Sequence, residues 1–477
     1  MLTPKDMAVL DANSEYLGVS VETLMENAGF GVASILEREF GTGKRIAVLC
    51  GCGNNGGDGF VAARYLRERN DVDVILAKSA DNIKGQAAWN NYEKVQEITK
   101  AWVGQELGGY DLLVDALLGT GFSGEPKEPF VAIIKAINSS GVPVLAVDLP
   151  SGLGSANVVR PNLTVSFHDM KLGMSEKNSG KVMVYDIGIP EDASRYCGPG
   201  DYAYYPIPVK TSHKGQNGRV LVIGGGPYTG APFLAAMGAY RIGADLVFIA
   251  APSSVSDTIS GYSPNVIVNK LPGSILSPGD LGRLRAMLRD MNSVLIGSGV
   301  GRDPQTFESV RNFVKVCDVP IVIDADSFAA LSGNLDLLKG KSGIMTPHGG
   351  EFLKLTGEEL ASDLDSRAEQ CRELAKRTGI TVLLKGAVDI VTDGKEIRLN
   401  RTGNPGMSVG GTGDVLAGIC AGLLAKGVPP FHAARIGAFT NGAAGDLAFD
   451  DCSYGLLATD VIENVPLVMR KSLDNFR

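Results

Sequence analysis

The segment LCGCGNNGGDGF at residues 49–60 places several glycines, two asparagines and an aspartate between an apolar run and a helical pattern. Glycines at such a junction let backbone N–H groups approach an anion closely, and the following helix adds the positive end of its dipole. The pattern therefore predicts binding of a phosphate or pyrophosphate. The side-chain oxygens of Asn54, Asn55 and Asp58 also suit a hard cation or hydroxyl groups.

Residues 51–56 fit the G-x-G-x-x-G dinucleotide fingerprint, which is a weak signal by itself. A nicotinamide dehydrogenase would carry an acidic residue at the end of the next strand, where it binds the ribose. Asp71 and Asp73 instead begin the apolar run at 71–78. The sequence therefore disfavours a classical dehydrogenase.

Polar side chains follow two further apolar runs. Asp115 and the glycine-rich segment 119–125 come after one run, and Asp148 and Ser151 come after another. Ligands of open parallel sheets bind at the carboxyl ends of the strands. We therefore expect Asp115, Asp148 and Ser151 to face one site together with Asn55.

A second glycine-dense turn opens the helix expected near residue 412. Gly410, Gly411 and Gly413 can present several N–H groups to a phosphoryl group, and the helix dipole points its positive end there. Asp414 follows at a position where it could deprotonate a hydroxyl nucleophile. An anion-binding turn beside a general base is the minimum for phosphoryl transfer. The chain has no G-x-x-x-x-G-K-[ST] motif, which excludes a P-loop NTPase.

The elements that must position these residues alternate between apolar strands and amphipathic helices. This pattern predicts parallel sheets covered on both faces. The Pro-, Gly- and Tyr-rich segment 190–212 follows neither period, so we predict two α/β domains, 1–205 and 206–477, the first a Rossmann-like doubly wound sheet. We expect a helix over 57–70 and a strand over 381–394.

Composition narrows the class of protein. The 477 residues carry 45 basic and 53 acidic side chains, a net charge of -8, which argues against a nucleic-acid-binding surface. Seven scattered cysteines and four histidines offer no convincing zinc cluster. The N-terminus lacks a signal pattern, and no apolar run is long enough to span a membrane, so we expect a cytoplasmic protein without membrane segments.

Segments 24–29, 51–66, 114–125 and 147–153 resemble the NAD(P)HX epimerase family, also called the YjeF N-terminal family. The resemblance implies a potassium ion held by Asn55, Asp115 and Ser151. It also makes Asp148, which would contact the substrate, the candidate for proton transfer. The residues implied to hold the hydrated dinucleotide, NADHX or NADPHX, are Asn54, Asn55, Gly56, Gly57, Asp58, Gly119, Thr120, Gly121, Phe122, Ser123, Gly124, Glu125 and Asp148.

The segment SFHDMKLG, with His168 and Lys171, also resembles that family. Gly154 departs from it, because many relatives carry an aspartate at that position.

Segments 212–244, 296–303, 322–327, 346–352, 383–391 and 404–418 resemble the NAD(P)HX dehydratase branch of the ribokinase-like superfamily. This resemblance implies a ribokinase-like α/β sandwich and a reaction that consumes ADP or ATP. It also implies that Mg²⁺ bridges the phosphates, with Glu351 beside the metal-bound water. Asn441 departs from the family, in which a histidine is common. The residues implied to contact the hydrate are Ala231, Gly299, His348 and Asp414, and those implied to bind the nucleotide are Lys385, Gly386, Ala387, Val388, Asp389, Gly411, Thr412 and Gly413.

Together the resemblances predict a bifunctional repair enzyme with catalytic residues Asp148 and Asp414. The first domain would interconvert the R and S epimers of NAD(P)HX. The second would phosphorylate the ring hydroxyl of the S epimer and eliminate phosphate. A ribokinase-type small-molecule kinase and a non-enzymatic RNA-processing scaffold are the alternatives. Relatives form symmetric assemblies, so we expect a homo-oligomer. The sequence leaves open whether ADP or ATP is the donor, whether NADHX or NADPHX is the preferred substrate, and whether the two sites are coupled.

Overall fold

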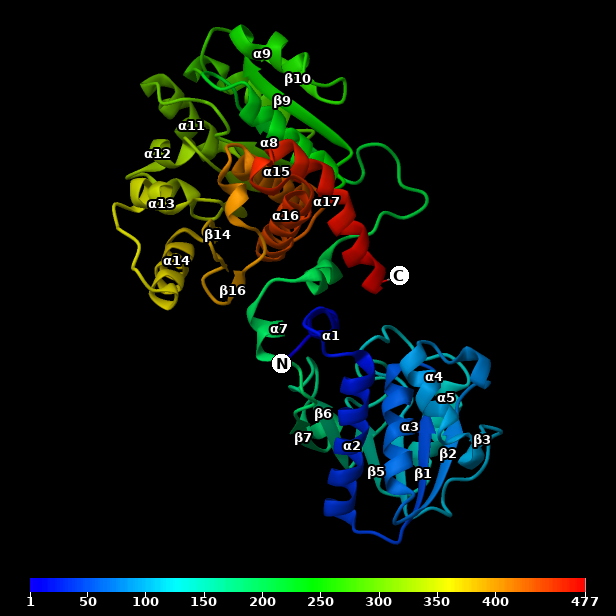
Figure 1. The fold of residues 1–477 in the computed structure, drawn as a ribbon. Helices are drawn as coiled ribbons and strands as arrows, with labels where there is room; N and C mark the ends of the chain where they lie inside the picture. The colour runs from blue at the N-terminus through cyan, green and yellow to red at the C-terminus, as the bar shows by residue number, and fades with distance from the viewer. Residues whose placement is uncertain (477) are drawn as a thin grey trace. The chain divides into compact units, whose positions relative to one another are not determined.

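The computed structural model describes residues 1–476, and its contacts divide the chain into two compact units, Met1–Ala193 and a second that begins at Ser194 (Figure 1). Residues 194–205, which precede the predicted boundary at 205/206, are grouped with the second unit. There the Cys197 N–H donates to the Leu399 carbonyl at 2.7 Å. No helix within residues 1–476 has both the length and the apolar character that membrane crossing requires.

The first unit contains one seven-stranded sheet in the order β3-β2-β1-β4-β5-β6-β7. Every neighbouring pair in it is parallel, as predicted for a doubly wound fold. Its strands are β1 Arg45–Cys50, β2 Asp71–Leu76, β3 Thr99–Ala101, β4 Leu112–Ala116, β5 Val144–Val147, β6 Leu163–Phe167 and β7 Lys181–Tyr185.

Helices cover both faces of this sheet. Ile46 and Val48 of β1 belong to the apolar cluster that includes α2 and α3, which run side by side, whereas Ala47 and Leu49 pack with α5 (Figure 1). This alternation is the one expected for a strand buried on both faces. The helices are α1 Pro4–Tyr16, α2 Val21–Phe40, α3 Asn54–Leu66, α4 Gln86–Glu93, α5 Phe130–Ser139, α6 Glu176–Ser179 and α7 Glu191–Arg195.

Helix α3 runs from Asn54 to Leu66. The prediction of a helix over 57–70 therefore placed its start three residues too late and its end four residues too late. Its first turn contains the Asn-Asn-Gly-Gly-Asp segment, which the sequence suggested was loop. Gly56 allows this early start, because a Cβ there would lie 2.0 Å from the Gly51 carbonyl oxygen. The anion-binding end of the helix therefore lies directly after β1.

The second unit contains a nine-stranded sheet in the order β10-β9-β8-β11-β12-β13-β14-β15-β16. The strands from β10 to β14 pair in parallel, whereas β15 pairs antiparallel with both β14 and β16. The strand expected over 381–394 is wrong as one element, because residues 385–388 turn between β14 and β15. The strands are β8 Arg219–Ile223, β9 Leu246–Pro252, β10 Ile267–Leu271, β11 Ser293–Ile296, β12 Ile321–Ile323, β13 Gly343–Met345, β14 Thr381–Leu384, β15 Asp389–Thr392 and β16 Ile397–Asn400.

Two helical layers cover this sheet. One apolar cluster joins the sheet to α8, α15, α16 and α17, and a second joins the opposite face to α10, α11, α12, α13 and α14 (Figure 1). The predicted two-domain α/β fold is confirmed. The helices are α8 Gly230–Arg241, α9 Ser253–Ser260, α10 Leu281–Leu288, α11 Pro304–Val316, α12 Ser327–Leu331, α13 Gly349–Thr356, α14 Leu364–Thr378, α15 Thr412–Ala425, α16 Pro430–Cys452 and α17 Ala458–Leu473.

Helices α8 and α15 approach each other through glycines. A Cβ at Gly418 would lie 1.9 Å from the Ala235 carbonyl oxygen, and one at Gly238 would lie 2.5 Å from that of Val415. A Cβ at Gly422 would lie 2.9 Å from the Ala239 carbonyl oxygen. Larger residues would force the helices apart, so these glycines fix the depth at which α15 sits.

We expect Gly418→Ala to destabilise the second unit by about 1–3 kcal/mol, because the new methyl group overpacks a backbone contact. Gly282 of α10 provides the control, since a Cβ there meets nothing within 4 Å. Gly282→Ala should be neutral or should stabilise by up to about 1 kcal/mol through helix propensity. Denaturant unfolding of both variants measures the difference, and equal stabilities would contradict the close approach.

Candidate active sites

The first unit has a cavity of about 610 Å³ at the carboxyl ends of its strands, bounded also by α1 and α2. Most of the residues predicted to bind the dinucleotide lie on its wall, from the first turn of α3, the segment after β4 and the end of β5. The predicted residues that line it are Asn54, Asn55, Asp58, Gly119, Thr120, Gly121, Phe122 and Asp148.

The other predicted residues of this site lie off the cavity wall. Gly56 and Gly57 are buried, and a Cβ on Gly57 would lie 2.6 Å from the Met25 Cε, so both serve the packing of α3. Glu125 accepts a hydrogen bond from the Ala156 N–H at 3.1 Å, which ties its glycine-rich segment to the segment after β5. Ser123 and Gly124 do not line the cavity.

Asp115 and Ser151, from the ends of β4 and β5, meet beneath this cavity. The Ser151 hydroxyl donates to Asp115 Oδ1 at 2.6 Å, and the Ser151 N–H donates to Oδ2 at 2.9 Å. Both residues are fully buried. Burial raises the pKa of Asp115 to about 6, against the lowering effect of the Ser151 hydrogen bonds. The predicted convergence of the strand ends is therefore present for this pair.

The same region fits a monovalent cation. The Asp115 carboxylate has no basic side chain within 4 Å among the described residues, so its buried charge is not balanced by the protein. Asn55 is also buried, and its side-chain oxygen is the atom that could bind a cation, because the unpaired amide nitrogen is a donor. A Cβ on Gly119 would lie 3.4 Å from Asn55 Oδ1, so the glycine leaves room beside that oxygen.

Asp148 is held by a buried lysine. Lys171 Nζ lies 2.6 Å from Asp148 Oδ1, and both side chains are less than a tenth exposed. The ammonium also donates to the carbonyls of Phe167 and Asp169, at 2.6 and 3.1 Å. The Phe167 N–H donates to the same Asp148 oxygen at 3.1 Å, and Asp148 has a φ of 64°, a conformation rare outside glycine. These contacts fix the orientation of the Asp148 carboxylate.

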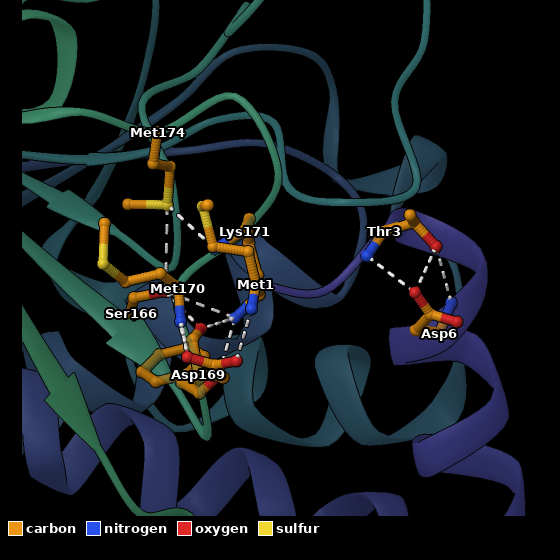
Figure 2. A network of polar contacts seen from close by, with 9 residues as sticks. Met1, Thr3, Asp6, Ser166, Asp169, Met170, Lys171 and Met174 are labelled. Carbon is orange, nitrogen blue, oxygen red and sulfur yellow. Dashed lines mark hydrogen bonds and ion pairs between the residues drawn. The ribbon is translucent and has the colours of Figure 1, made fainter. Parts of the chain in front are cut away.

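The N-terminal segment supports the loop that carries Lys171, as Figure 2 shows. Leu2 pairs with Lys171 through a parallel bridge, in which the Leu2 N–H donates to the Met170 carbonyl at 2.9 Å. The Met1 ammonium lies 2.9 Å from Asp169 Oδ2. Sequence analysis noted Lys171 without a role, and the bridge from Leu2 had no visible signal.

Two further carboxyls line the cavity, and Asp11 was missed by sequence analysis. Asp11 of α1 lines the cavity, and its side chain is exposed there. The protein atoms around it and the charge of Asp148 raise its pKa to about 6, although Lys171 opposes this. Burial and the charges of Asp148 and Asp11 also raise the pKa of Asp58. The site therefore combines one oriented carboxylate with carboxyls that retain protons more readily.

The second unit has two cavities beside the N-terminus of α15. One, of about 600 Å³, is lined by all four residues predicted to contact the hydrate, namely Ala231, Gly299, His348 and Asp414, and also by Gly411. Further side chains on its wall are Tyr228, Arg302, Asp326, Glu351 and Lys354.

The other cavity, of about 380 Å³, contains most of the residues predicted to bind the nucleotide. Val388 does not line it and instead packs against the core. Because Gly411 and Asp414 face one cavity and Thr412 and Gly413 the other, the first turn of α15 lies between them. The predicted residues on this second wall are Lys385, Gly386, Ala387, Asp389, Thr412 and Gly413.

Asp414 lies in a group of opposed charges at this turn. Lys385 Nζ lies 3.0 Å from Asp324 Oδ1 and 3.7 Å from Glu351 Oε2. Burial and the charge of Asp324 raise the pKa of Asp414 to about 7, although Lys385 opposes this. Burial lowers the pKa of Lys385, but Asp324 and Glu351 outweigh it, so that its pKa is raised. A carboxyl that titrates near neutrality suits a general base.

His348 and Glu351 cap α13. His348 Nδ1 accepts from the Gly350 N–H at 3.0 Å, and Glu351 Oε2 accepts from the His348 N–H at 2.9 Å. The capping bonds fix the imidazole, whose other nitrogen, Nε2, lies 3.5 Å from Glu351 Oε1. Asp324, which sequence analysis did not single out, accepts from the Thr346 hydroxyl at 2.8 Å and is buried. Its position after β12 was the available signal.

These sites define an α/β enzyme with a strand-end dinucleotide cavity in one unit and a phosphoryl-transfer site of ribokinase-like type in the other. The family model described as "YjeF-related protein N-terminus" matches residues 21–173, and that described as "NAD(P)H-hydrate dehydratase" matches residues 220–467. The chain belongs to the family of bifunctional NAD(P)H-hydrate repair enzymes.

Curated relatives with that name cover nearly the whole chain. The one from Hyperthermus butylicus is 41% identical over 99% of this chain and 93% of the relative, and the one from Archaeoglobus fulgidus is 39% identical over 98% and 97%. A solved structure of the ADP/ATP-dependent NAD(P)H-hydrate dehydratase from Bacillus subtilis, crystallised with ATP and Mg²⁺, is 26% identical. It covers 58% of this chain and 98% of its own, with a TM-score of 0.51.

We expect Lys171→Met to destabilise the first unit by about 3–5 kcal/mol, because it leaves the buried Asp148 carboxylate unpaired. Lys181→Met is the matched control, since Lys181 makes an equally short pair of 2.6 Å with Glu39 but is 60% exposed. That pair should contribute less than about 1 kcal/mol. Hydrogen exchange of the β5 and β6 amides reports both, and similar protection in the two variants would refute the importance of the buried pair.

Proposed function

We propose that this chain restores hydrated nicotinamide dinucleotides, with the first unit interconverting the R and S epimers of NAD(P)HX and the second dehydrating the S epimer. One observation carries the proposal most strongly. The first turn of α15 lies between two cavities, one lined by the residues predicted to contact the hydrate, Asp414 included, and the other by most of those predicted to bind the nucleotide. That arrangement suits transfer of a phosphoryl group from nucleotide to ring hydroxyl.

In the first unit, epimerisation inverts the ring carbon that carries the hydroxyl, which requires a base and an acid at one site. Asp148 serves as the base, because the buried Lys171 ammonium, 2.6 Å away, fixes the orientation of its carboxylate. Asp11 is suited to hold the complementary proton, because it lines the same cavity and its pKa is raised to about 6. Two carboxyls with different proton affinities are a recurring arrangement for paired acid and base roles.

We propose that Asn55, Asp115 and Ser151 hold a potassium ion, which balances the buried charge of Asp115 and supports the cavity floor. Oxygen ligands of this kind suit a hard cation. Asp148 and the ends of α3 and β4 then orient the dinucleotide.

In the second unit, Asp414 takes the proton of the ring hydroxyl while the hydroxyl oxygen attacks the terminal phosphorus of ADP or ATP. The bond from phosphorus to the leaving nucleotide breaks, and N–H groups of Gly411 to Gly413 stabilise the transferred charge. The carbon–oxygen bond of the phosphate ester then breaks, and inorganic phosphate leaves with the electron pair. A neighbouring ring carbon gives its proton to the departing phosphate, which restores the double bond. Lys385 lies beside Gly413, where it can neutralise phosphate charge.

The charges of this site fit a divalent cation. Asp324, Glu351 and Asp414 are carboxyls around the single ammonium of Lys385. Among residues 1–476 no three His, Cys, Asp or Glu side chains are arranged to hold a metal by themselves. We therefore propose that Mg²⁺ binds with the nucleotide phosphates, as is usual for this small cation, with Glu351 near its water ligands.

The first test is an assay of both epimers of NADHX with potassium, Mg²⁺ and either ADP or ATP. The near-ultraviolet absorbance of reduced nicotinamide should return for the whole mixture, and the comparison names the donor. Asp148→Asn should restore only the S fraction, and replacement of potassium by a bulky organic cation should have the same effect. Asp414→Asn should restore neither fraction but still interconvert the epimers on chromatography.

The Asp148→Asn variant should keep dehydration and the Asp414→Asn variant should keep epimerisation. The activity that each variant retains therefore shows that the chain has folded. A stable phosphorylated product without return of absorbance would favour the small-molecule kinase instead. Full dehydration by Asp414→Asn would refute its role as the base.

The dehydration rate should depend on pH through Asp414. Because the base acts when ionised and its pKa is raised to about 7, the rate with the S epimer should fall about tenfold per pH unit below about 7 and level off above it. Single-turnover rates from about pH 5.5 to 8.5 measure this dependence. A flat profile in the wild type would contradict the assignment, since no ionisation would then limit the step.

The cytoplasmic location and the homo-oligomeric state stay predictions from the sequence. So does the contact of each predicted side chain with substrate.

A further inference from the structure

The cavity that we assign to the nucleotide has two chemically different parts. Lys385 and Gly413 form the part that suits phosphates, since a Cβ on Gly413 would lie 3.4 Å from Lys385 Nζ. The rest of the wall includes Met407 and Leu416, with Asn441 of α16 beside them. Apolar side chains beside a polar amide are a usual surface for a flat heterocycle that needs an oriented polar contact.

Asn441 is unusual within that wall. Its side chain is 7% exposed, and its amide oxygen has no hydrogen-bond partner in the protein among residues 1–476. A buried carbonyl oxygen left unpaired destabilises a fold, because it has lost its hydrogen bonds to water. Asn441, which stands where relatives often carry a histidine, thus has a buried amide oxygen that bonds no other described group of the protein.

The other polar side chains of the same cavity are already engaged. The Asn404 amide donates to the Gly445 carbonyl at 3.1 Å and accepts from the Gly406 N–H at 3.0 Å. The Thr412 hydroxyl donates to the Met407 carbonyl at 2.9 Å.

Near the same wall, Asp389 and Thr402 both bond the Asn400 side chain, at 3.0 and 2.8 Å. Of the amides on the wall, Asn441 is the one with an unpaired oxygen among the described residues.

We propose that the Asn441 amide pairs with the N6/N7 edge of an adenine base and so selects an adenine nucleotide as the phosphoryl donor. An asparagine amide offers one acceptor and one donor side by side, which match the 6-amino group and N7 of adenine. A 6-oxo purine presents two acceptors on that edge and cannot satisfy the amide oxygen. This inference rests on the proposed nucleotide-dependent dehydration and adds the residue that reads the base.

Calorimetric binding of ADP and inosine diphosphate to the full chain with Mg²⁺, in the absence of hydrate, tests the proposal. The wild type should bind ADP about tenfold more tightly than inosine diphosphate, the size of one hydrogen bond to a buried group. Asn441→Leu should weaken ADP binding about tenfold and leave inosine diphosphate nearly unchanged, so the preference disappears. Leu416→Met is the matched control, because it alters the same wall without changing hydrogen bonding and should preserve the preference.

Thermal unfolding without nucleotide separates recognition from folding. Asn441→Leu should unfold at the same or a higher temperature, because it removes an unpaired buried oxygen. Equal weakening of both nucleotides, which indicates contact with sugar or phosphate, or unchanged ADP affinity would overturn the inference while dehydration itself persists. Failure of the wild type to bind either nucleotide would overturn both this inference and the proposed dehydration.

Discussion

The second unit depends on the close approach of α8 and α15. Gly418, and with it Gly238 and Gly422, let backbone meet backbone where a Cβ would lie 1.9 to 2.9 Å from a carbonyl oxygen. That contact sets the depth of α15 and therefore where its free N–H groups point. Gly411, with a φ of 102°, turns the chain into the helix and places Asp414 in its first turn. The two cavities lie beside one helix end because this contact admits no other depth.

In the first unit, a close backbone contact at the end of a strand likewise sets the position of a helix. A Cβ at Gly51 would lie 1.9 Å from the Leu117 carbonyl oxygen, so β1 and the segment after β4 touch where the chain enters α3. Asn55 of α3 then lies against Gly119, where a Cβ on the glycine would be 3.0 Å from the Asn55 Cβ. Lys171 fixes Asp148 after β5. In both units glycines fix the backbone, and a buried ion pair or hydrogen-bonded carboxylate fixes the reactive side chains upon it.

The periodicity of the sequence predicted the fold class, because strands buried on both faces and amphipathic helices have different repeats. Residues at strand ends, such as Asp115 and Ser151, were predictable for the same topological reason. Helix α3 began earlier than predicted, because the Gly56 contact with Gly51 depends on tertiary packing that no local propensity reports. Asp11 could not be found, since only the folded chain brings α1 to the strand ends.

The charges around α15 explain why its aspartate can act as a base near neutrality. A helix N-terminus favours the ionised form of Asp414, but burial and Asp324 favour the protonated form and prevail. The charge of Lys385 lowers the pKa of Asp414, while its ammonium pairs with Asp324 and lies near Glu351. In the proposed reaction a nucleotide would add phosphate charge on the Lys385 side, and a divalent cation that accompanies it would balance that charge. The carboxyls that raise the pKa of Asp414 would then also favour a nucleotide that carries a metal ion.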